Sequence, residues 1–260
     1  MTGKTDAAFR TLGGEGDDCL LIHGFASDRM SWLANVPALL PAARVHVLDL
    51  PGHGESLVDV GDGSLSSLAD HVDSALAQNN ITRVHLIGHS LGGGLAMLLA
   101  AKRPEMVASL ALIAPAGLGI GVDPVFLAAY PEANGVEETT VLLRSLVVRP
   151  QIIGKQLAQR VLDQLSRAGA REALRRIAHQ IRFTEEHLLS EAAPVIARNI
   201  PRMVLWGAED NINRKSLPKL KAFGGEFHLI EEAAHLPQVE KPKETNGHLV
   251  AFLKSLKATG

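Results

Sequence analysis

The chain has 260 residues, 46% of them hydrophobic, which is enough for one large domain with a substantial core. Lys and Arg together number 26 and Asp and Glu 28, so the sequence lacks the positive charge excess that nucleic acids or anionic membranes attract. We therefore expect neither a nucleic acid nor a membrane as a partner, and nothing in the sequence indicates an oligomeric state.

The first residues, the longest apolar stretch and the cysteine content limit the classes of protein to which the chain can belong. Residues 1–6 lack the apolar core of a signal peptide, so a cytoplasmic location is the simplest expectation. The longest nearly uninterrupted apolar stretch, 107–120, contains Pro115 and is shorter than the roughly 20 residues of a membrane helix. Cys19 is the only cysteine, which excludes a disulfide framework and a cysteine-based metal cluster.

Strand and helix patterns alternate through the first part of the chain. The glycine-rich residues 1–17 leave room for at most two brief edge strands. Apolar strand patterns then occur at 19–22, 44–49, 83–87 and 107–114. Between them, helical spacing of apolar residues occurs at 31–40, 64–76 and 91–103. This order is typical of a parallel sheet that helices cover on both faces.

The alternation stops between about residues 117 and 199, where only helical patterns occur. Strand patterns resume at 202–206 and 226–230, with helical patterns at 215–223 and 243–257. We therefore predict one α/β core domain, built from residues 1–116 and 200–260, with a helical cap of residues 117–199 inserted into it.

The sequence is organised around residues 88–92, Gly-His-Ser-Leu-Gly, which join an apolar strand to a run of helix formers. This G-x-S-x-G pattern, with a strand before it and a helix after it, predicts a nucleophile elbow with Ser90 at the sharp turn. Glycine two residues on either side of the serine leaves room for the crossing backbones. Ser90 is therefore the candidate nucleophile.

A serine hydroxyl needs a base to accept its proton, and the base needs an acid to fix its tautomer. Two loops that follow late strands offer these groups, at residues 206–210 and 231–235. We choose Asp210 as the acid because its short side chain lies at the loop tip, and keep Glu209 as the alternative. His235 is the base by position, since the other histidines lie in strands, helices, the cap or early loops.

The tetrahedral oxyanion that forms on nucleophilic attack needs two backbone N–H donors. Leu91, the residue after the nucleophile, supplies one of them. The other comes from the loop after the first parallel strand, where Phe25 lies. We expect His23 and His53, which flank glycines in early loops, to form structural hydrogen bonds.

Metal and cofactor sites receive no support from the sequence. His85 and His89 are four residues apart, but a strand and a turn do not place them on one face as a helix would. No glycine-rich segment has the pattern of a phosphate-binding or dinucleotide-binding loop. We therefore predict no metal and no cofactor.

Taken together, these motifs make the chain resemble the α/β-hydrolase superfamily over about residues 18–256. The resemblance rests on HGF at 23–25, DLPGHGES at 49–56, GHSLGG at 88–93, WGAED at 206–210 and AAH at 233–235. It implies a mostly parallel eight-stranded sheet with a lid, and Ser90, Asp210 and His235 as the triad. Residues 108–119 look more narrowly like the hydrolase-like part of the acyltransferase component of acetoin-cleaving systems.

These features predict a serine hydrolase that cleaves a small, mainly apolar carboxylic ester or thioester through an acyl-enzyme on Ser90. The same triad also serves acyl transfer to an acceptor other than water and the hydrolysis of carbon–carbon bonds, so both remain open. A ligand-binding protein that keeps the pocket without catalysis is the alternative outside the enzymes.

Overall fold

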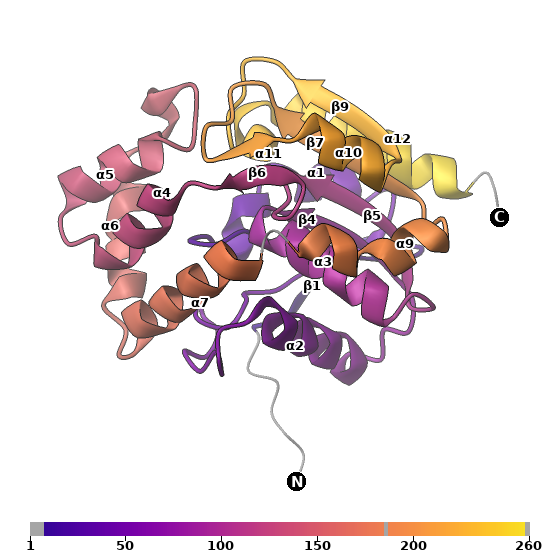
Figure 1. Cartoon of the computed structure of the whole chain (residues 1–260), viewed down its shortest axis with the longest axis horizontal. Coiled ribbons are helices and arrows are strands. Elements are labelled where there is room, and N and C mark those ends of the chain that lie inside the picture. Colours follow the sequence, from indigo (N-terminus) through magenta and orange to yellow (C-terminus); the bar gives the residue numbers. More distant parts are fainter. Residues whose placement is uncertain (1–7, 185–186, 258–260) are drawn as a thin grey trace, which may run out of the picture.

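The computed structural model describes residues 8–184 and 187–257, and its core is one seven-stranded sheet (Figure 1). The strands lie in the order β1-β3-β2-β4-β5-β7-β9, and only β1 runs antiparallel to its neighbour. Their bounds are β1 (Arg10–Gly13), β2 (Asp18–Ile22), β3 (Arg44–Val47), β4 (Val84–His89), β5 (Val107–Ile113), β7 (Arg202–Gly207) and β9 (Glu226–Ile230).

Alternate residues of the strands enter two separate apolar layers, which explains the near-continuous hydrophobic strand sequences. In β2, Leu20 and Ile22 pack on one face of the sheet, whereas Cys19 and Leu21 pack on the other. The first face is covered by α2 (Leu65–Gln78), α3 (Leu91–Lys102), α9 (Ala193–Ala197) and α10 (Leu217–Phe223). The second face is covered by α1 (Val36–Leu39) and α12 (Pro242–Lys257).

The chain between β5 and β7 is mostly helical, and its part 124–184 lies to one side of the sheet, at the left of Figure 1. It builds a third apolar cluster of its own, which includes Phe126, Leu143 and Val161. Its helices are α4 (Pro124–Ala129), η2 (Tyr130–Glu132), α5 (Val136–Arg144), η3 (Pro150–Ile152), α6 (Lys155–Leu165), α7 (Ala170–Thr184) and α8 (Leu188–Glu191), followed by α9. The last two short helices, α8 and α9, pack against α3.

A short antiparallel ribbon ties the start of this interval to the core. Strand β6 (Gly119–Val122) pairs with β8 (Asn213–Lys215), which follows β7. The expectation of an exclusively helical interval at 117–199 was therefore wrong at its first residues. The β6 sequence, Gly-Ile-Gly-Val, is too short to show a strand period and becomes a strand only because β8 lies beside it.

The mostly parallel α/β fold with helices on both faces is confirmed, with differences in detail. The main sheet has seven strands among the described residues, where eight were expected, and the region before Asp18 contributes only β1. The helix expected at 31–40 is divided into η1 (Arg29–Trp32) and α1, because the backbone turns at Asn35 and Pro37 occupies the first turn of α1.

Candidate active site

Ser90 occupies the sharp turn between β4 and α3, with backbone angles φ 52° and ψ −115°. A non-glycine residue in this region is strained by about 1–3 kcal/mol, so the surrounding structure must hold it in place. A Cβ atom on Gly88 would lie 2.4 Å from the carbonyl oxygen of Gly92, and one on Gly92 would lie 2.3 Å from that of Ile22. The two glycines of the motif are therefore required by close backbone contacts.

His235 connects Ser90 to Asp210 through both nitrogens of its ring. Its Nε2 lies 3.1 Å from Ser90 Oγ and its Nδ1 lies 2.9 Å from Asp210 Oδ2. The carboxylate can only accept, so Nδ1 carries the hydrogen and Nε2 is free to accept the serine proton. All three residues are buried. The three residues predicted from distant parts of the sequence thus form one hydrogen-bonded chain.

Asp210 lies in a turn just after β7 that fixes its carboxylate. Oδ1 accepts hydrogen bonds from the backbone N–H groups of Ile212 and Asn213, each at 2.9 Å, which leaves Oδ2 for His235. Burial raises the pKa of the Asp210 carboxyl, but His235 and these N–H donors outweigh it and lower the pKa below its ordinary value. Glu209, the alternative acid, instead accepts from the N–H of Ala233 at 3.1 Å.

The loop that carries His235 is held by two residues to which the sequence analysis assigned no role in the active site. His89 Nε2 lies 2.8 Å from the carbonyl oxygen of His235. Glu240, which is buried in α11 (Pro237–Glu240), accepts from the N–H of Ala234 at 2.7 Å and from that of Val148 at 2.7 Å. His89 lies within the motif beside Ser90, which is a usable signal, whereas the sequence around Glu240 gives none.

Phe25 and Leu91 line the same cavity as Ser90. The two segments are close, because a Cβ atom on Gly24 would lie 3.1 Å from the Cβ of Ser90. Within the described residues, the backbone N–H groups of Phe25 and Leu91 have no hydrogen-bond acceptor. These N–H groups therefore have no partner within the protein, as an oxyanion donor requires.

His23 and His53 hold the loop that contains Phe25, as structural hydrogen bonders. His23 Nδ1 lies 2.8 Å from the carbonyl oxygen of Gly24, and His53 Nε2 accepts from the N–H of Ala26 at 3.2 Å. Burial lowers the pKa of His23 to about 4 and that of His53 to about 3. Both rings are therefore neutral at pH 7, which lets His53 accept at Nε2 and lets His23, which donates through Nδ1, accept the N–H of Leu50 at Nε2.

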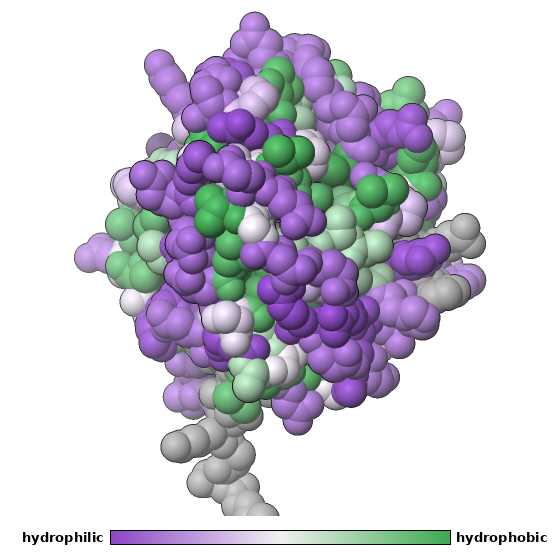
Figure 2. All heavy atoms as spheres, turned by 90° about the vertical axis from the view of Figure 1, so that its left-hand side faces the viewer, coloured by the Kyte–Doolittle hydropathy of each residue, from purple (hydrophilic) through white to green (hydrophobic). Residues whose placement is uncertain are grey.

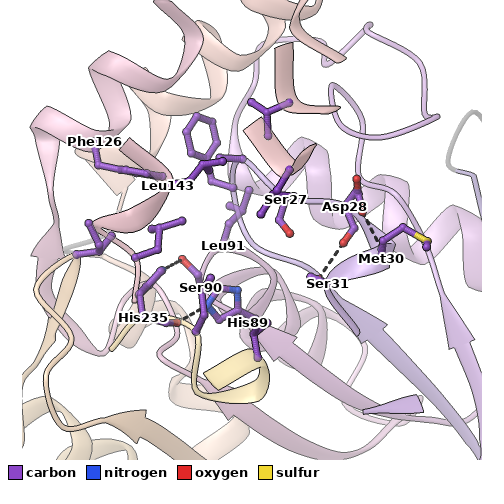
Figure 3. Close-up of a pocket in the computed structure, with 18 of the residues that line it drawn as sticks. Ser27, Asp28, Met30, Ser31, His89, Ser90, Leu91, Phe126, Leu143 and His235 are labelled. Carbon is purple, nitrogen blue, oxygen red and sulfur yellow. Dashed lines mark hydrogen bonds between the residues drawn. The ribbon is translucent and has the colours of Figure 1, made fainter. Parts of the chain in front are cut away.

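A cavity of about 350 Å³ opens over Ser90 between the sheet and the helical interval. Figure 3 shows Ser90, His89 and His235 together on one side of it, with Asp28, Met30 and Ser31 on the other. Figure 2, which faces the side of the molecule where α5 and α6 lie, shows apolar residues reaching the surface in patches among hydrophilic ones. The lining is mainly apolar and includes Phe25, Leu33, Leu91, Val122, Phe126, Leu127, Leu143, Leu146, Ile153, Leu157, Val161, Ile181, Ile212, Leu236 and Val239.

Residues 8–184 and 187–257 contain no group of three or more His, Cys, Asp or Glu side chains that could hold a metal ion. Over the same part of the chain, no helix is both long enough and apolar enough to cross a membrane.

Known proteins resemble this chain in sequence and in structure. The acetyltransferase component of the acetoin cleaving system from Pseudomonas putida, a dihydrolipoyllysine-residue acetyltransferase, is 35% identical over 94% of this chain, which covers 65% of its length. The pimeloyl-[acyl-carrier protein] methyl ester esterase of Aeromonas hydrophila is 29% identical over 89% of this chain and 93% of its own length.

A solved structure and a family model extend the comparison. The meta-cleavage product hydrolase from Pseudomonas fluorescens IP01 superposes with a TM-score of 0.80 at 22% identity, covering 96% of this chain and 94% of that one, a likeness of fold. The model of the alpha/beta hydrolase family matches residues 19–247, nearly the whole sheet with its helices. The chain therefore belongs to the alpha/beta hydrolase family.

Proposed function

We propose that this protein is a serine hydrolase that cleaves a small, mainly apolar carboxylic ester or thioester through an acyl-enzyme on Ser90. The observation that carries the proposal is the hydrogen-bonded chain from Ser90 Oγ through His235 to Asp210, buried at the floor of an apolar cavity. In this proposal the helical residues 117–199 act as a cap that forms much of the cavity wall.

In the first half of the reaction, Ser90 Oγ attacks the carbonyl carbon of the substrate while His235 Nε2 accepts the serine proton. Asp210 keeps His235 in the required tautomer and stabilises the positive charge that forms on its ring. The negative oxygen of the tetrahedral intermediate binds the N–H groups of Phe25 and Leu91. The carbon–oxygen or carbon–sulfur bond then breaks, and His235 returns the proton to the leaving alcohol or thiol.

In the second half, water attacks the acyl-enzyme and gives one proton to His235. The intermediate collapses, the carboxylic acid leaves, and the proton returns to Ser90. Each proton transfer takes place at His235 Nε2, so a single base serves both halves.

The test compares Ser90→Ala with Ser255→Ala as a matched control. In the wild type, the hydroxyl of Ser255 donates to the carbonyl of Phe252 within α12. We expect Ser90→Ala to reduce the hydrolysis of p-nitrophenyl acetate and butyrate by roughly 10⁶-fold, to the background rate, with its folding intact. A fluorophosphonate probe should label the wild type and Ser255→Ala but not Ser90→Ala. Undiminished turnover in Ser90→Ala would refute the proposal, and an unlabelled wild type would favour a ligand-binding protein.

Acyl transfer is the second candidate, because the Pseudomonas putida relative is an acetyltransferase component. Here a thiol would replace water in the second half and carry the acyl group away as a thioester. Incubating the enzyme with p-nitrophenyl acetate and dihydrolipoamide separates the two functions. Accumulation of S-acetyl dihydrolipoamide faster than acetate would favour transfer, whereas acetate alone would favour hydrolysis.

A further inference from the structure

The apolar cavity has one polar cluster away from Ser90, and it joins the core to helix α6. Asp28 Oδ2 accepts hydrogen bonds from Arg160 Nη2 and from Gln164 Nε2, each at 2.7 Å. Arg160 and Gln164 are one turn apart on α6, and all three residues line the cavity. The Asp28 side chain is 11% exposed and that of Arg160 is 46% exposed.

Asp28 belongs to the same short loop as Phe25. Its other oxygen, Oδ1, accepts from the N–H of Met30 at 2.8 Å and caps the helix η1. At the opposite end of the loop, His23 binds the carbonyl of Gly24. Phe25 therefore lies between Gly24 and Asp28, which are both held by hydrogen bonds, and Asp28 is also bonded to α6.

The backbone between these anchors is not in a relaxed conformation. Ala26 has φ 67°, a region that residues with a side chain rarely adopt, and its N–H is held by His53. The ring of Phe25 packs edge-on against Tyr130 of the helical interval, with the ring centroids 5.8 Å apart. The position of the Phe25 N–H thus depends on contacts with the helical interval as well as with the core.

We propose that Asp28 is a positioning residue through which helix α6 holds the Phe25 N–H in line with Ser90. The inference rests on the proposed function, in which Phe25 is an oxyanion donor. When α6 is bonded to Asp28, the loop is held from both ends and the donor faces the place where the oxyanion forms. When those bonds are absent, the loop keeps its cap on η1 and the bond from Ala26 to His53 but loses its tie to α6, so Phe25 is held less firmly.

Such a shift would act on the transition state and not on substrate binding. A misplacement of about 1 Å can cost about 10²-fold in rate, and the loss of one oxyanion donor costs about 10²- to 10³-fold. A direct contact of Arg160 with the substrate would instead change KM. The division between kcat and KM therefore distinguishes the two roles of this cluster.

The test is the double variant Arg160→Met/Gln164→Leu, which removes both donors to Asp28 and leaves its bond to Met30. With p-nitrophenyl butyrate, we expect kcat to fall about tenfold or more while KM changes less than about twofold. The affinity for a trifluoromethyl ketone, which forms a tetrahedral adduct on Ser90, should fall in parallel. The pH profile of kcat should keep its midpoint, because the bonds of His235 are unchanged.

Lys155→Met is the matched control, since it removes a cation of α6 that pairs with Glu137 of α5 instead of with the core. It should keep the wild-type kcat. Arg160→Lys, which keeps Gln164 and a cation, should recover most of the kcat lost in the double variant.

Three results would overturn the inference. They are a double variant with unchanged kcat, one with raised KM alone, and one whose kcat falls without any loss of affinity for the trifluoromethyl ketone. These differ from failure of the proposed function, in which the wild type itself would neither turn over the ester nor react with a fluorophosphonate.

Discussion

His89 Nε2 lies 2.8 Å from the backbone carbonyl oxygen of His235, and the two rings have their centroids 4.9 Å apart. Burial lowers the pKa of His89 to about 3, so its ring is neutral at pH 7. A carbonyl oxygen only accepts, and His89 must therefore carry its hydrogen on Nε2. The last residue of β4 thus holds the loop that follows β9, across the strands between them.

Replacing His89 tests whether this bond positions the base. In His89→Phe the carbonyl of His235 loses its donor, and we expect kcat for p-nitrophenyl butyrate to fall about tenfold or more as the imidazole loses its fixed direction. His89→Gln, whose amide can reach a similar position, should retain most of the activity. Equal kcat in the wild type and His89→Phe would show that the loop needs no such support.

Substitutions at Asp210 and Glu209 distinguish which of the two residues is the acid of the triad. Asp210→Asn keeps the size of the side chain but favours the wrong tautomer of His235, so we expect kcat to fall by about 10⁴-fold with little change in KM. Glu209→Gln, a change of the same kind one residue earlier, should stay within about threefold of the wild type because Glu209 accepts from the N–H of Ala233, a bond that a glutamine oxygen can still accept. The opposite ranking in steady-state kinetics would make Glu209 the acid.

The close backbone contacts of Gly92 predict that an alanine at this position destabilises the folded protein. In Gly92→Ala the new Cβ would lie 2.3 Å from the carbonyl oxygen of Ile22 and 2.5 Å from that of His23, and backbone atoms cannot rotate away. We expect a loss of about 1–3 kcal/mol in the free energy of unfolding, measured in urea.

Gly247→Ala is the control for this substitution. It lies in α12 with nothing within 4 Å of its new Cβ, so it should stabilise the protein by up to about 1 kcal/mol. If the two variants unfolded at the same urea concentration, the close contact at Gly92 would not affect the free energy of unfolding.

The buried histidines predict that the protein loses stability in mild acid. His23, His53 and His89 have pKa values of about 4, 3 and 3 when folded, against 6.5 as the ordinary value. Between pH 6.5 and about 4 the unfolded chain therefore binds more protons than the folded one. The free energy of unfolding should fall with decreasing pH across this window, by up to about 1.4 kcal/mol per unit for each histidine.

Urea unfolding at pH 7.5, 6.5, 5.5 and 4.5 measures this slope. His53→Gln removes one of these groups and should make the slope shallower, because one histidine fewer binds its proton more weakly in the folded state than in the unfolded chain. A slope that stayed the same in His53→Gln would mean that this ring ionises freely in the folded protein.

The sequence was most informative where a local pattern has a local physical cause. The elbow at Ser90 could be predicted because its glycines are demanded by crossing backbones only a few residues apart. The bounds expected for the strand at 226–230 are those of β9, although Phe227 and Leu229 are exposed at this edge of the sheet and only Ile230 is buried. The loops that carry Asp210 and His235 follow from the strand order alone.

Other features depend on partners that no local pattern reveals. Strand β6 forms because β8, about 90 residues away along the chain, supplies its hydrogen bonds. The same holds for Glu240, which joins the loop before His235 to Val148, and for Asp28, whose partners lie on α6. The side chains on both ends of such contacts are ordinary polar residues, and only the folded arrangement shows which of them meet.

The β6–β8 ribbon places the start of the helical interval beside Asp210. Asn213 opens β8, donates its backbone N–H to Asp210 and binds the carbonyls of Ala114 and Pro115 through its amide. The residues that frame the acid thus flank the helical interval along the chain, 114–115 before it and 210–213 after it. Changes in the helices of the interval can therefore leave Asp210 in place, whereas His235, whose backbone N–H donates to the carbonyl oxygen of Leu146 at 3.0 Å, depends on the interval directly.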